Sequence, residues 1–522
     1  MLVRAIRALV ARLTEQSSTL RTRTIAASDD DLDALLLRAG ELHNAGDPNA
    51  ARALYQNALG RHAGNKDALY HLGVIAAQSE DYTGARKLLE KAVACDPHFG
   101  DGWNALANIE KLQEHWEEAE RLYHRALALN PGAAAVWSNL GLCLREAGRF
   151  DEAQTALQRA RELAPNFAEA LLNLATVTTD QGRPQLALEM LHRVLALEPD
   201  LAEAHTALAH LLLQDGEFAA GWREYEWRFK CLDATRQPQH PFPRWDGTPI
   251  KDRVLLVRAE QGLGDQVMFA SCLPDAIERA GVCLVECEPR LVGLFTRSFP
   301  QARVYPYRGK RDPEWAQCGY APDYQIHIGS LPGLFRRHAA DFPRHGAYLH
   351  ADPIRIEHWR EQLARLGPGR KIGISWRGGA PRTRRTLRTA ALAELATLWA
   401  QKNIVFVSLQ YGDCGDELSE FVTQTSHAVT HWQQALDDYD ETAALVSALD
   451  LVISVQTAVV HLAGALGKPA WVLVPVVPEW RYMAQGARMP WYPTVNLVRQ
   501  TVRGDWASVC HDVAKGLVQS LK

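Results

Sequence analysis

Residue types suited to group-transfer chemistry gather in three short stretches in the C-terminal half of this 522-residue chain. The first is a glycine-rich turn in which Gly262 and Gly264 precede Asp265. The turn lacks the full G-x-G-x-x-G dinucleotide fingerprint, and a carboxylate at the helix entry argues against a phosphate bound there. Asp265 can cap the helix that follows, or it can take a proton from an acceptor hydroxyl; the sequence leaves both roles open.

The second stretch is a run of basic residues, 362–393, that contains no acidic residue. Its middle, S-W-R-G-G-A-P-R-T-R-R-T-L-R, follows an expected strand and contains Arg377, Arg384 and Arg385. Charge runs commonly lie on a solvated face, but a basic, glycine-containing loop at the carboxyl end of a strand favours a bound diphosphate. Nucleic acid is not the expected ligand, because the run is short and has no aromatic ladder.

The third stretch, L-V-I-S-V-Q-T-A-V-V-H-L-A-G-A-L-G-K-P, predicts a buried strand, a turn, a helix and a glycine that ends it. Gln456 and Thr457 fall at the helix N-terminus, whose free N–H groups and dipole suit an anion. His461 follows Thr457 by four residues and therefore lies on the same helix face. Taken alone, such a histidine is more often a packed polar residue than a ligand.

Short apolar runs predict the strands that position these stretches, in two series. They are V-L-L-V-R, V-C-L-V-E-C, A-R-V-Y-P-Y and Y-Q-I-H-I, then K-I-G-I-S-W, I-V-F-V-S-L-Q, L-V-I-S-V and A-W-V-L-V-P. With helices between them, they predict two parallel α/β units, whose ligand would lie between the carboxyl ends of the two sheets. The loops after Arg258, Trp376, Gln410 and Val455 are therefore the expected binding loops, and Gln410 is a candidate substrate ligand.

The N-terminal half follows a different pattern, a 34-residue period marked by Pro97, Pro131, Pro165 and Pro199. This period predicts stacked helix-turn-helix units. The units are expected to begin at Leu32, Lys66, Gly100, Ala134, Ala168 and Ala202. A second recurrent position holds only alanine, as expected where two helices approach closely: Ala51, Ala85, Ala119, Ala153 and Ala187.

These units resemble the tetratricopeptide repeat over about residues 32–235. Trp103 and Trp137 stand at its aromatic position, and Gly73 and Gly141 at its glycine position. Such solenoids present a groove that binds an extended peptide or another protein, so recruitment of a protein acceptor is the expected role. Homodimerisation, or a mere extension of the enzyme's surface, is the alternative.

The C-terminal motifs also resemble a known family, over about residues 250–515. G-L-G-D, W-R-G-G and S-V-Q-T-A-V-V-H-L-A-G-A-L-G-K-P, followed by P-E-W-R and P-W-Y-P, are similar to glycosyltransferases of the heptosyltransferase-like family nine. More closely, they resemble its bacterial variant fused behind tetratricopeptide repeats. The resemblance implies a GT-B fold of two Rossmann-like domains, a sugar nucleotide held mainly by the C-terminal one, and inverting transfer without a metal or other cofactor.

The resemblance assigns roles to individual residues. Asp265 matches the family's proposed general base, and Arg384 or Arg385 matches its donor-phosphate contacts. Thr457 and His461 match its donor-binding turn and helix. An inverting transfer needs such a base for the acceptor hydroxyl, together with positive charge and oriented N–H groups for the departing diphosphate.

One position departs from the family pattern: Gln456 stands where family members commonly have Asp. A glutamine can still hydrogen-bond a sugar or ribose hydroxyl, but it carries no charge. The substitution leaves open whether the donor differs or activity is reduced.

Composition narrows the class of protein. The 57 Lys and Arg nearly balance the 61 Asp and Glu, so the global charge calls for neither nucleic acid nor an acidic membrane. Nine cysteines without zinc-like C-x-x-C pairs indicate reduced thiols and a cytoplasmic protein. The chain contains no apolar run long enough to predict a transmembrane span.

The expected organisation is an α superhelical repeat domain followed by an α/β GT-B domain. A basic amphipathic segment, 1–31, precedes the solenoid at 32–240, and the Rossmann-like halves occupy 241–360 and 361–522. The segment is expected to be a frayed or capping helix, with membrane contact as the alternative.

The leading hypothesis is a glycosyltransferase whose repeats recruit a protein acceptor, such as a flagellin or another surface protein. The alternatives are transfer to a glycan intermediate, a scaffold that binds a nucleotide sugar with reduced catalysis, or a GT-B-like epimerase or hydrolase.

Overall fold

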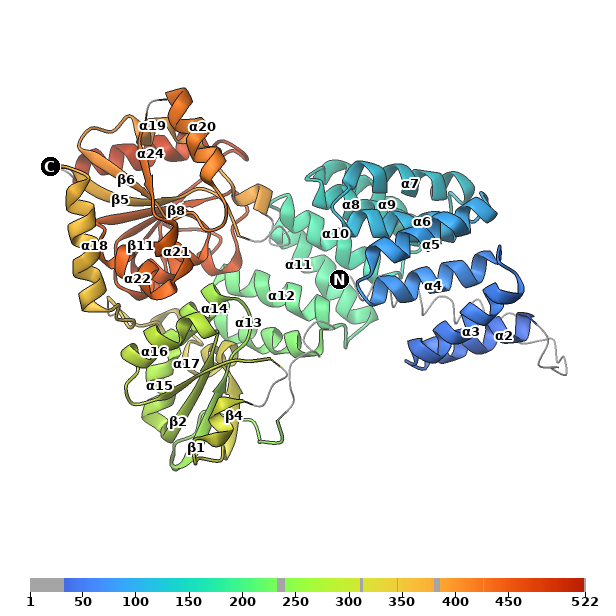
Figure 1. Ribbon diagram of the computed structural model, residues 1–522, viewed down its shortest axis with the longest axis horizontal. Coiled ribbons are helices and arrows are strands. Elements are labelled where there is room, and N and C mark those ends of the chain that lie inside the picture. Colours follow the sequence, from blue (N-terminus) through green and yellow to red (C-terminus); the bar gives the residue numbers. More distant parts are fainter. Residues whose placement is uncertain are drawn as a thin grey trace. The chain divides into compact units, whose positions relative to one another are not determined.

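The computed structural model describes residues 32–231, 240–309, 313–344, 346–379, 385–425 and 427–520 (Figure 1). They form two compact units, one within Met1–Ala204 and Phe229–Thr235, the other His205–Arg228 with Arg236–Lys522. The expected fold class is confirmed, because helical repeats precede an α/β region with two parallel sheets. The basic segment 1–31 lies outside the described residues.

The described helices of the first part of the chain come in antiparallel pairs. The bounds are α2 Leu32–Asn44, α3 Pro48–Arg61, α4 Lys66–Gln78, α5 Tyr82–Cys95, α6 Gly100–Leu112, α7 Trp116–Leu129, α8 Ala134–Glu146, α9 Phe150–Leu163, α10 Ala168–Asp180, α11 Pro184–Leu197, α12 Ala202–Asp215 and α13 Phe218–Tyr225. The first helix of each pair begins at the residue where the 34-residue register starts a unit. The boundary between the two units falls inside α12.

Side-chain size explains the repeat register. The recurrent alanines of the second helices are fully buried. An ideal Cβ on Gly73 would lie 2.8 Å from Leu89 Cγ, and one on Gly141 would lie 2.5 Å from Leu157 Cγ, so only glycine permits this helix spacing. Trp103 Nε1 donates a hydrogen bond to the carbonyl of Pro97 at 2.9 Å, as Trp137 does to Pro131, tying the aromatic position to the proline turn.

The second unit contains two α/β halves. The first has four parallel strands in the order β3-β2-β1-β4, the arrangement of a Rossmann half. The strands are β1 Ile250–Arg258, β2 Ala280–Cys287, β3 Arg303–Pro306 and β4 Tyr324–His327. The helices are α14 Leu263–Phe269, α15 Leu273–Arg279, α16 Val292–Ser298 and α17 Leu331–Phe335.

The second half has seven strands in the order β10-β11-β9-β8-β5-β6-β7, all parallel except for the β10–β11 pair. The strands are β5 Arg370–Ser375, β6 Ile404–Ser408, β7 Val429–His431, β8 Leu451–Val455, β9 Ala470–Val474, β10 Arg488–Met489 and β11 Tyr492–Arg499. The helices are α18 Pro353–Arg365, α19 Ala396–Trp399, α20 Gly415–Thr425, α21 Gln433–Asp437, α22 Tyr439–Ala448, α23 Ala458–Ala465 and α24 Trp506–Ser520. The strand order reverses between β1 and β4 in one sheet and between β5 and β8 in the other, where such folds bind ligands.

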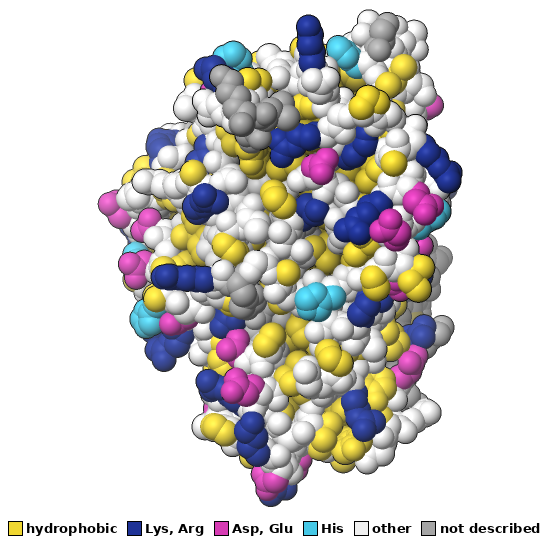
Figure 2. Space-filling model, turned by 90° about the vertical axis from the view of Figure 1, so that its left-hand side faces the viewer, with side chains coloured by type: hydrophobic (Ala, Val, Ile, Leu, Met, Phe, Trp, Pro, Cys, Tyr) yellow, Lys and Arg dark blue, Asp and Glu magenta, His cyan; other side chains and the backbone are white. Residues whose placement is uncertain are grey.

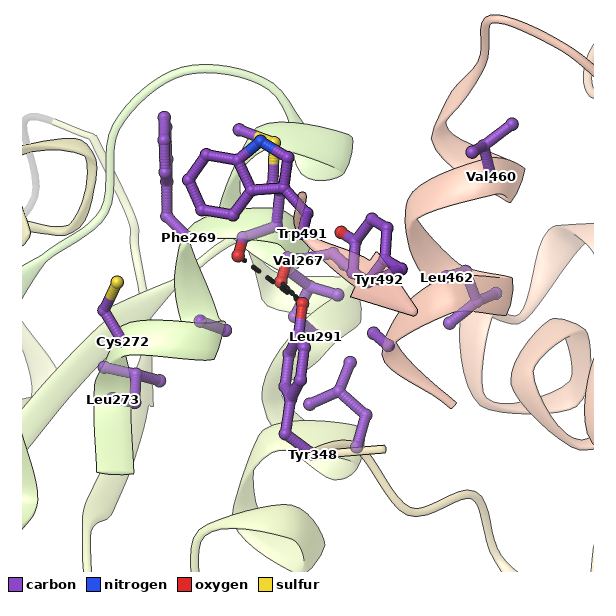
Figure 3. Packing of buried hydrophobic residues seen from close by; sticks show 14 of the residues in the cluster. Val267, Phe269, Cys272, Leu273, Leu291, Tyr348, Val460, Leu462, Trp491 and Tyr492 are labelled. Atoms are coloured by element: carbon purple, nitrogen blue, oxygen red, sulfur yellow. Dashed lines mark hydrogen bonds between the residues drawn. The ribbon is translucent and has the colours of Figure 1, made fainter. Parts of the chain in front are cut away.

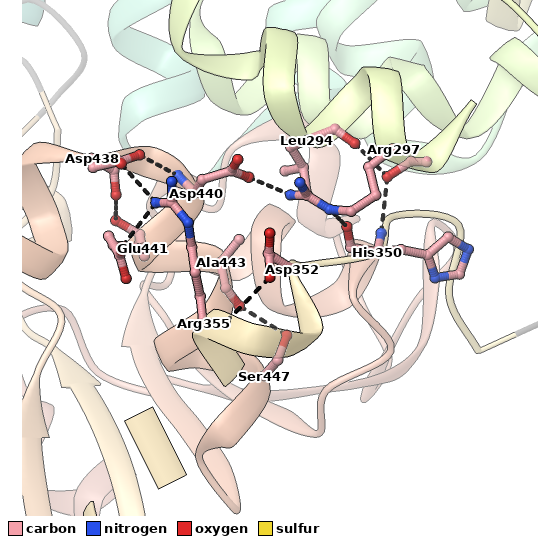
Figure 4. Close-up of polar contacts among 12 residues, drawn as sticks. Leu294, Arg297, His350, Asp352, Arg355, Asp438, Asp440, Glu441, Ala443 and Ser447 are labelled. Carbon is pink, nitrogen blue, oxygen red and sulfur yellow. Dashed lines mark hydrogen bonds and ion pairs between the residues drawn. The ribbon is translucent and has the colours of Figure 1, made fainter. Parts of the chain in front are cut away.

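The two halves of the second unit share a core. Figure 3 shows Phe269 and Trp491 packed together, with their ring centroids 6.0 Å apart, and the Tyr348 hydroxyl donating to the carbonyl of Val267 at 2.8 Å. Figure 4 shows a polar contact in which Arg297 of α16 pairs with Asp440 of α22 at 2.5 Å. These contacts hold the halves in a defined arrangement.

Positive and negative side chains are mixed on the surface, as expected from their nearly equal numbers in the sequence. On the face shown in Figure 2, Lys and Arg side chains are interspersed with Asp and Glu. Cys283 and Cys287 of β2 are buried and form no disulfide. Among the helices in the described ranges, none is both long enough and apolar enough to span a membrane.

Candidate active site

The glycine-rich turn places Asp265 at the junction of the two halves. Gly262 is the N-cap of α14, so Asp265 lies in the first turn of the helix and does not cap it. Asp265 Oδ1 accepts hydrogen bonds from Nε of Arg481 at 2.7 Å and from Nη2 of the same guanidinium. The second oxygen, Oδ2, accepts no hydrogen bond from the described residues. The carboxylate is thus anchored through one of its two oxygens.

Arg481 lies in the loop after β9, within η11 Trp480–Tyr482, and is largely buried. Its guanidinium stacks over the Trp480 ring at 4.6 Å, and Glu479 lies 3.7 Å away. Burial disfavours the charge, but Asp265 beside it holds the pKa of Arg481 above its usual value. The ion pair therefore joins a fixed cation of the second half to the carboxylate of the first.

Gly264 allows α14 to approach α23 closely. An ideal Cβ at this position would lie 3.2 Å from Cα of Ala458 and 3.4 Å from Cδ2 of His461. A Cβ at this position would be in tight contact with α23, so a larger residue would require α14 or α23 to shift. The close approach brings the turn that carries Asp265 to the first residues of α23.

The carboxyl end of β8 and the start of α23 present backbone N–H groups. Thr457 is the N-cap of α23, but its side chain does not cap the helix; its Oγ1 lies 3.0 Å from Ser454 Oγ. Gln456 is buried, its Oε1 accepts from the Glu479 N–H at 3.2 Å, and its Nε2 has no hydrogen-bond partner among the described residues. Arg388 donates to the carbonyl of Gln456 at 3.0 Å. An uncapped helix end, an unused amide donor and a nearby cation together suit an oxyanion or a hydroxyl-bearing ligand.

His461 is buried one turn into α23. Its Nδ1 lies 3.2 Å from the Tyr492 hydroxyl. Burial, with a smaller contribution from the charge of Arg481, lowers the pKa of His461 from 6.5 to about 3. His461 is therefore neutral near pH 7 and acts as a hydrogen-bonding group rather than a cation.

The buried neutral state of His461 predicts a pH dependence of stability. Below pH 6.5 the unfolded chain binds a proton that the folded chain rejects until about pH 3. This histidine therefore contributes stability that is complete above pH 6.5 and falls by up to about 1.4 kcal/mol per pH unit as the pH drops towards 3. His461→Gln should flatten that decline in denaturant titrations of the second unit, whereas His511→Gln, at an exposed site on α24, should leave it unchanged. An equally steep decline in the His461 variant would contradict the assignment.

Arg377 and Gln410 join the loops after β5 and β6. Gln410 is buried, and its Oε1 accepts from the backbone N–H groups of Trp376 at 3.1 Å and Arg377 at 2.8 Å. The Arg377 side chain donates to the carbonyl of Asp413 at 2.6 Å and lies 3.4 Å from Glu417. Both residues therefore lie at the carboxyl ends of β5 and β6, where their hydrogen bonds join the two loops.

Two predicted phosphate ligands lie where the structure gives no side-chain positions. Arg384 is outside the described residues, and Arg385 begins η9 Arg385–Arg388 with its side chain likewise outside them. Their contact with a donor phosphate stays a prediction. Arg388, from the same basic run, is placed beside Gln456.

The structure thus places Gly264 against Ala458 and His461 of α23. It links Asp265 and Gln456 through the loop after β9, where Asp265 pairs with Arg481 and Gln456 accepts from the N–H of Glu479. Sequence reasoning assigned no role to Arg481 or Arg388. Arg388 belongs to the basic run, and Arg481 ends the P-E-W-R motif. Neither the run nor the motif indicates which residue the arginine would contact. In the described ranges, no group of three or more His, Cys, Asp and Glu side chains is placed to hold a metal ion.

Comparisons with known proteins support the repeat assignment. Family models described as tetratricopeptide repeat match residues 42–109, 112–176 and 167–197. Protein FlbA of Caulobacter vibrioides is 35% identical over 326 residues, which are 60% of this chain and 54% of that protein. The chain thus spans about half the length of this curated relative.

Solved structures also match parts of the chain. A tetratricopeptide-repeat protein of Thermus thermophilus, TTC0263, is 23% identical with a TM-score of 0.33, covering 35% of this chain and all of that one. PilF of Pseudomonas aeruginosa is 28% identical with a TM-score of 0.30, covering 33% of this chain and 78% of that one.

Proposed function

We propose that the chain is a glycosyltransferase that moves a sugar from a nucleotide-sugar donor to an acceptor hydroxyl. The observation that carries the proposal is the meeting of the turn that contains Asp265 with the start of α23. Gly264, the neighbour of Asp265, lies against Ala458 and His461 of α23, a helix whose N-terminus has no side-chain cap. Asp265 itself pairs with Arg481 of the second half. The two α/β halves are compatible with the GT-B arrangement, in which a donor and an acceptor bind to different halves.

The geometry supports an inverting displacement. Oδ2 of Asp265 takes the proton of the acceptor hydroxyl, while Arg481 holds Oδ1 and so fixes the carboxylate. The acceptor oxygen then bonds to the anomeric carbon, and the bond from that carbon to the diphosphate oxygen breaks. The N–H groups of α23 and the basic run that contains Arg388 stabilise the charge that develops on the departing nucleoside diphosphate.

The donor contacts are assigned from the start of α23 and from the basic run. We assign the diphosphate to the α23 N-terminus with Thr457 and to Arg384 or Arg385. We assign a sugar or ribose hydroxyl to the unused Nε2 of Gln456. His461, neutral and held by Tyr492, supports the helix beneath the ligand. The nine cysteines, scattered without zinc-like C-x-x-C pairs, fit a reducing compartment, so we place the reaction in the cytoplasm.

We assign the repeats to acceptor recruitment, because tetratricopeptide solenoids commonly bind peptides or proteins through their groove. The acceptor would then be a protein whose hydroxyl reaches Asp265. A glycan intermediate is the alternative acceptor, and the repeats would then serve another partner.

A panel of nucleotide sugars tests the function. The purified chain should transfer or slowly hydrolyse at least one donor, and mass spectrometry of co-expressed proteins should reveal a hexose-sized or similar mass increase. A chain lacking residues 32–204 retains every contact described for the second unit, so it should keep donor hydrolysis but lose modification of the protein acceptor. Modification that survives this deletion would exclude recruitment by the solenoid, and absence of turnover with every donor would exclude the enzyme.

A second candidate, a scaffold with reduced catalysis, is favoured by one observation. The side chain at position 456 is uncharged, and its Oε1 is occupied by the N–H of Glu479. A scaffold should bind a nucleotide sugar without turning it over. Donor titration by calorimetry, run beside the turnover assay, separates the two candidates.

A further inference from the structure

The helical hairpin at residues 205–228, where the repeats end, belongs to the second unit. It contains most of α12, all of α13 and the start of η1 Glu226–Lys230. Its residues contact both α/β halves. One set of contacts reaches the loop that contains Arg481, and another reaches the turn that contains Asp265.

On the Arg481 side, the hairpin holds the loop 478–486. Gln214 of α12 donates its Nε2–H to the carbonyl of Pro478 at 2.9 Å, and its own carbonyl accepts from the N–H of Ala484 at 2.8 Å. The two hydrogen bonds bracket Arg481 within the loop. Arg499 of β11 also holds this loop, because it donates to the carbonyls of Tyr482 at 2.7 Å and Gly486 at 2.8 Å.

On the Asp265 side, the hairpin holds the glycine-rich turn. Arg228 binds Glu260 through two parallel hydrogen bonds of 3.0 and 2.6 Å, and it also donates to Ser330 at 2.8 Å. Glu260 is buried two residues after the end of β1 and two residues before Gly262. A bidentate, buried pair of this kind fixes position as well as charge.

Between these ends, aromatic side chains of α13 fill the junction. Trp222 lies 5.6 Å from Trp480 of the second half and 6.4 Å from Phe269 of the first, measured between ring centroids. Its Nε1 donates to the carbonyl of Arg336 at 2.9 Å. Tyr225 lies 5.9 Å from Trp480, and its hydroxyl accepts from Nε2 of Gln261 at 2.5 Å.

We propose that Gln214 and Arg228 are positioning residues, which set the Asp265–Arg481 pair from both sides of the junction. The hairpin then works as part of the active site and not as a repeat available to a partner. The kinetic part of this inference rests on the proposed function, whereas the structural part does not.

Hydrogen exchange in the full chain tests the structural part. Gln214→Ala should speed amide exchange in segment 478–486, and Arg228→Lys should speed exchange in segment 260–266, each by about tenfold or more, because the backbone loses its anchor. The matched controls are Gln181→Ala, whose side chain bonds Asp151 in the first unit, and Arg223→Lys, an exposed residue of α13. Both controls should leave exchange in the two segments unchanged.

Kinetics test the positioning role. Each variant should lower kcat by about ten- to a hundredfold with an unchanged KM for the donor, because a small displacement of the base affects the reacting geometry and not donor binding. Exchange rates equal to those of the controls, or an unchanged kcat in the folded Gln214→Ala chain, would overturn the inference. If the wild type turns over no donor, the proposed function fails, and the exchange experiment still decides the positioning role.

Discussion

Replacing Asp265 by asparagine is expected to lower kcat for sugar transfer by about 10²- to 10⁴-fold, the usual contribution of a positioned general base. The asparagine oxygen can still accept hydrogen bonds from Arg481, so the packing at the junction should survive. Donor affinity should change little, because the proposed donor ligands lie on the second half. Single-turnover kinetics with a saturating donor measure the first quantity, and calorimetric titration with the nucleoside diphosphate measures the second.

Asp252→Asn is the matched control. Asp252 lies in β1 of the same α/β half as Asp265, but its side chain is 86% exposed. It should retain the wild-type rate. An Asp265→Asn chain that transfers sugar within about threefold of the wild-type rate would place the base elsewhere. In that case the ion pair between Asp265 and Arg481 would stabilise the structure and take no part in the reaction.

The second large effect is expected on stability, from Arg228→Met. The substitution leaves the Glu260 carboxylate buried without its cation, although the Gly329 N–H still donates to it at 2.9 Å. Breaking one partner of a buried ion pair costs about 3–5 kcal/mol. The free energy of unfolding of the second unit should fall by that amount in denaturant titrations followed by tryptophan fluorescence.

Two companion variants identify the cause of that loss. Arg223→Met removes an exposed arginine from the same helical hairpin and should change stability by less than about 0.5 kcal/mol. The double variant Arg228→Met with Glu260→Gln removes both charges, so it should recover part of the loss. If the double variant were as unstable as the sum of two independent losses, the ion pair would not be the source of the stability.

Local patterns in the sequence predicted the repeat half down to individual helix starts. A helix buries the face that its apolar spacing defines, so Ala51, Ala85 and their equivalents reveal which residues must be small. The prolines mark the turns because they cannot continue a helix. The same reasoning found β8, the turn at Gln456 and Thr457, and α23, since strand, turn and helix follow one another without a break in the chain.

The assignment of residues 205–228 could not be read from these patterns. The 34-residue register treats α12 and α13 as one more repeat, and helical periodicity is the same whether a helix packs on a neighbouring repeat or on an α/β core. The contacts of Gln214 and Arg228 decide the matter, and they depend on partners more than thirty residues away or, for Pro478, 264 residues away.

The sequence by itself determined the two architectures, the strands whose carboxyl ends carry the chemistry, and the candidate Asp265. Only the tertiary structure decided that Asp265 is paired with Arg481, 216 residues along the chain. The structure also shows that Gly262, and not Asp265, occupies the N-cap position of α14. The reason is physical: burial and backbone geometry act through near neighbours and leave a periodic trace in the sequence. An ion pair between two halves depends on how whole sheets and loops pack. Such packing produces no regular residue spacing from which the pair could be predicted.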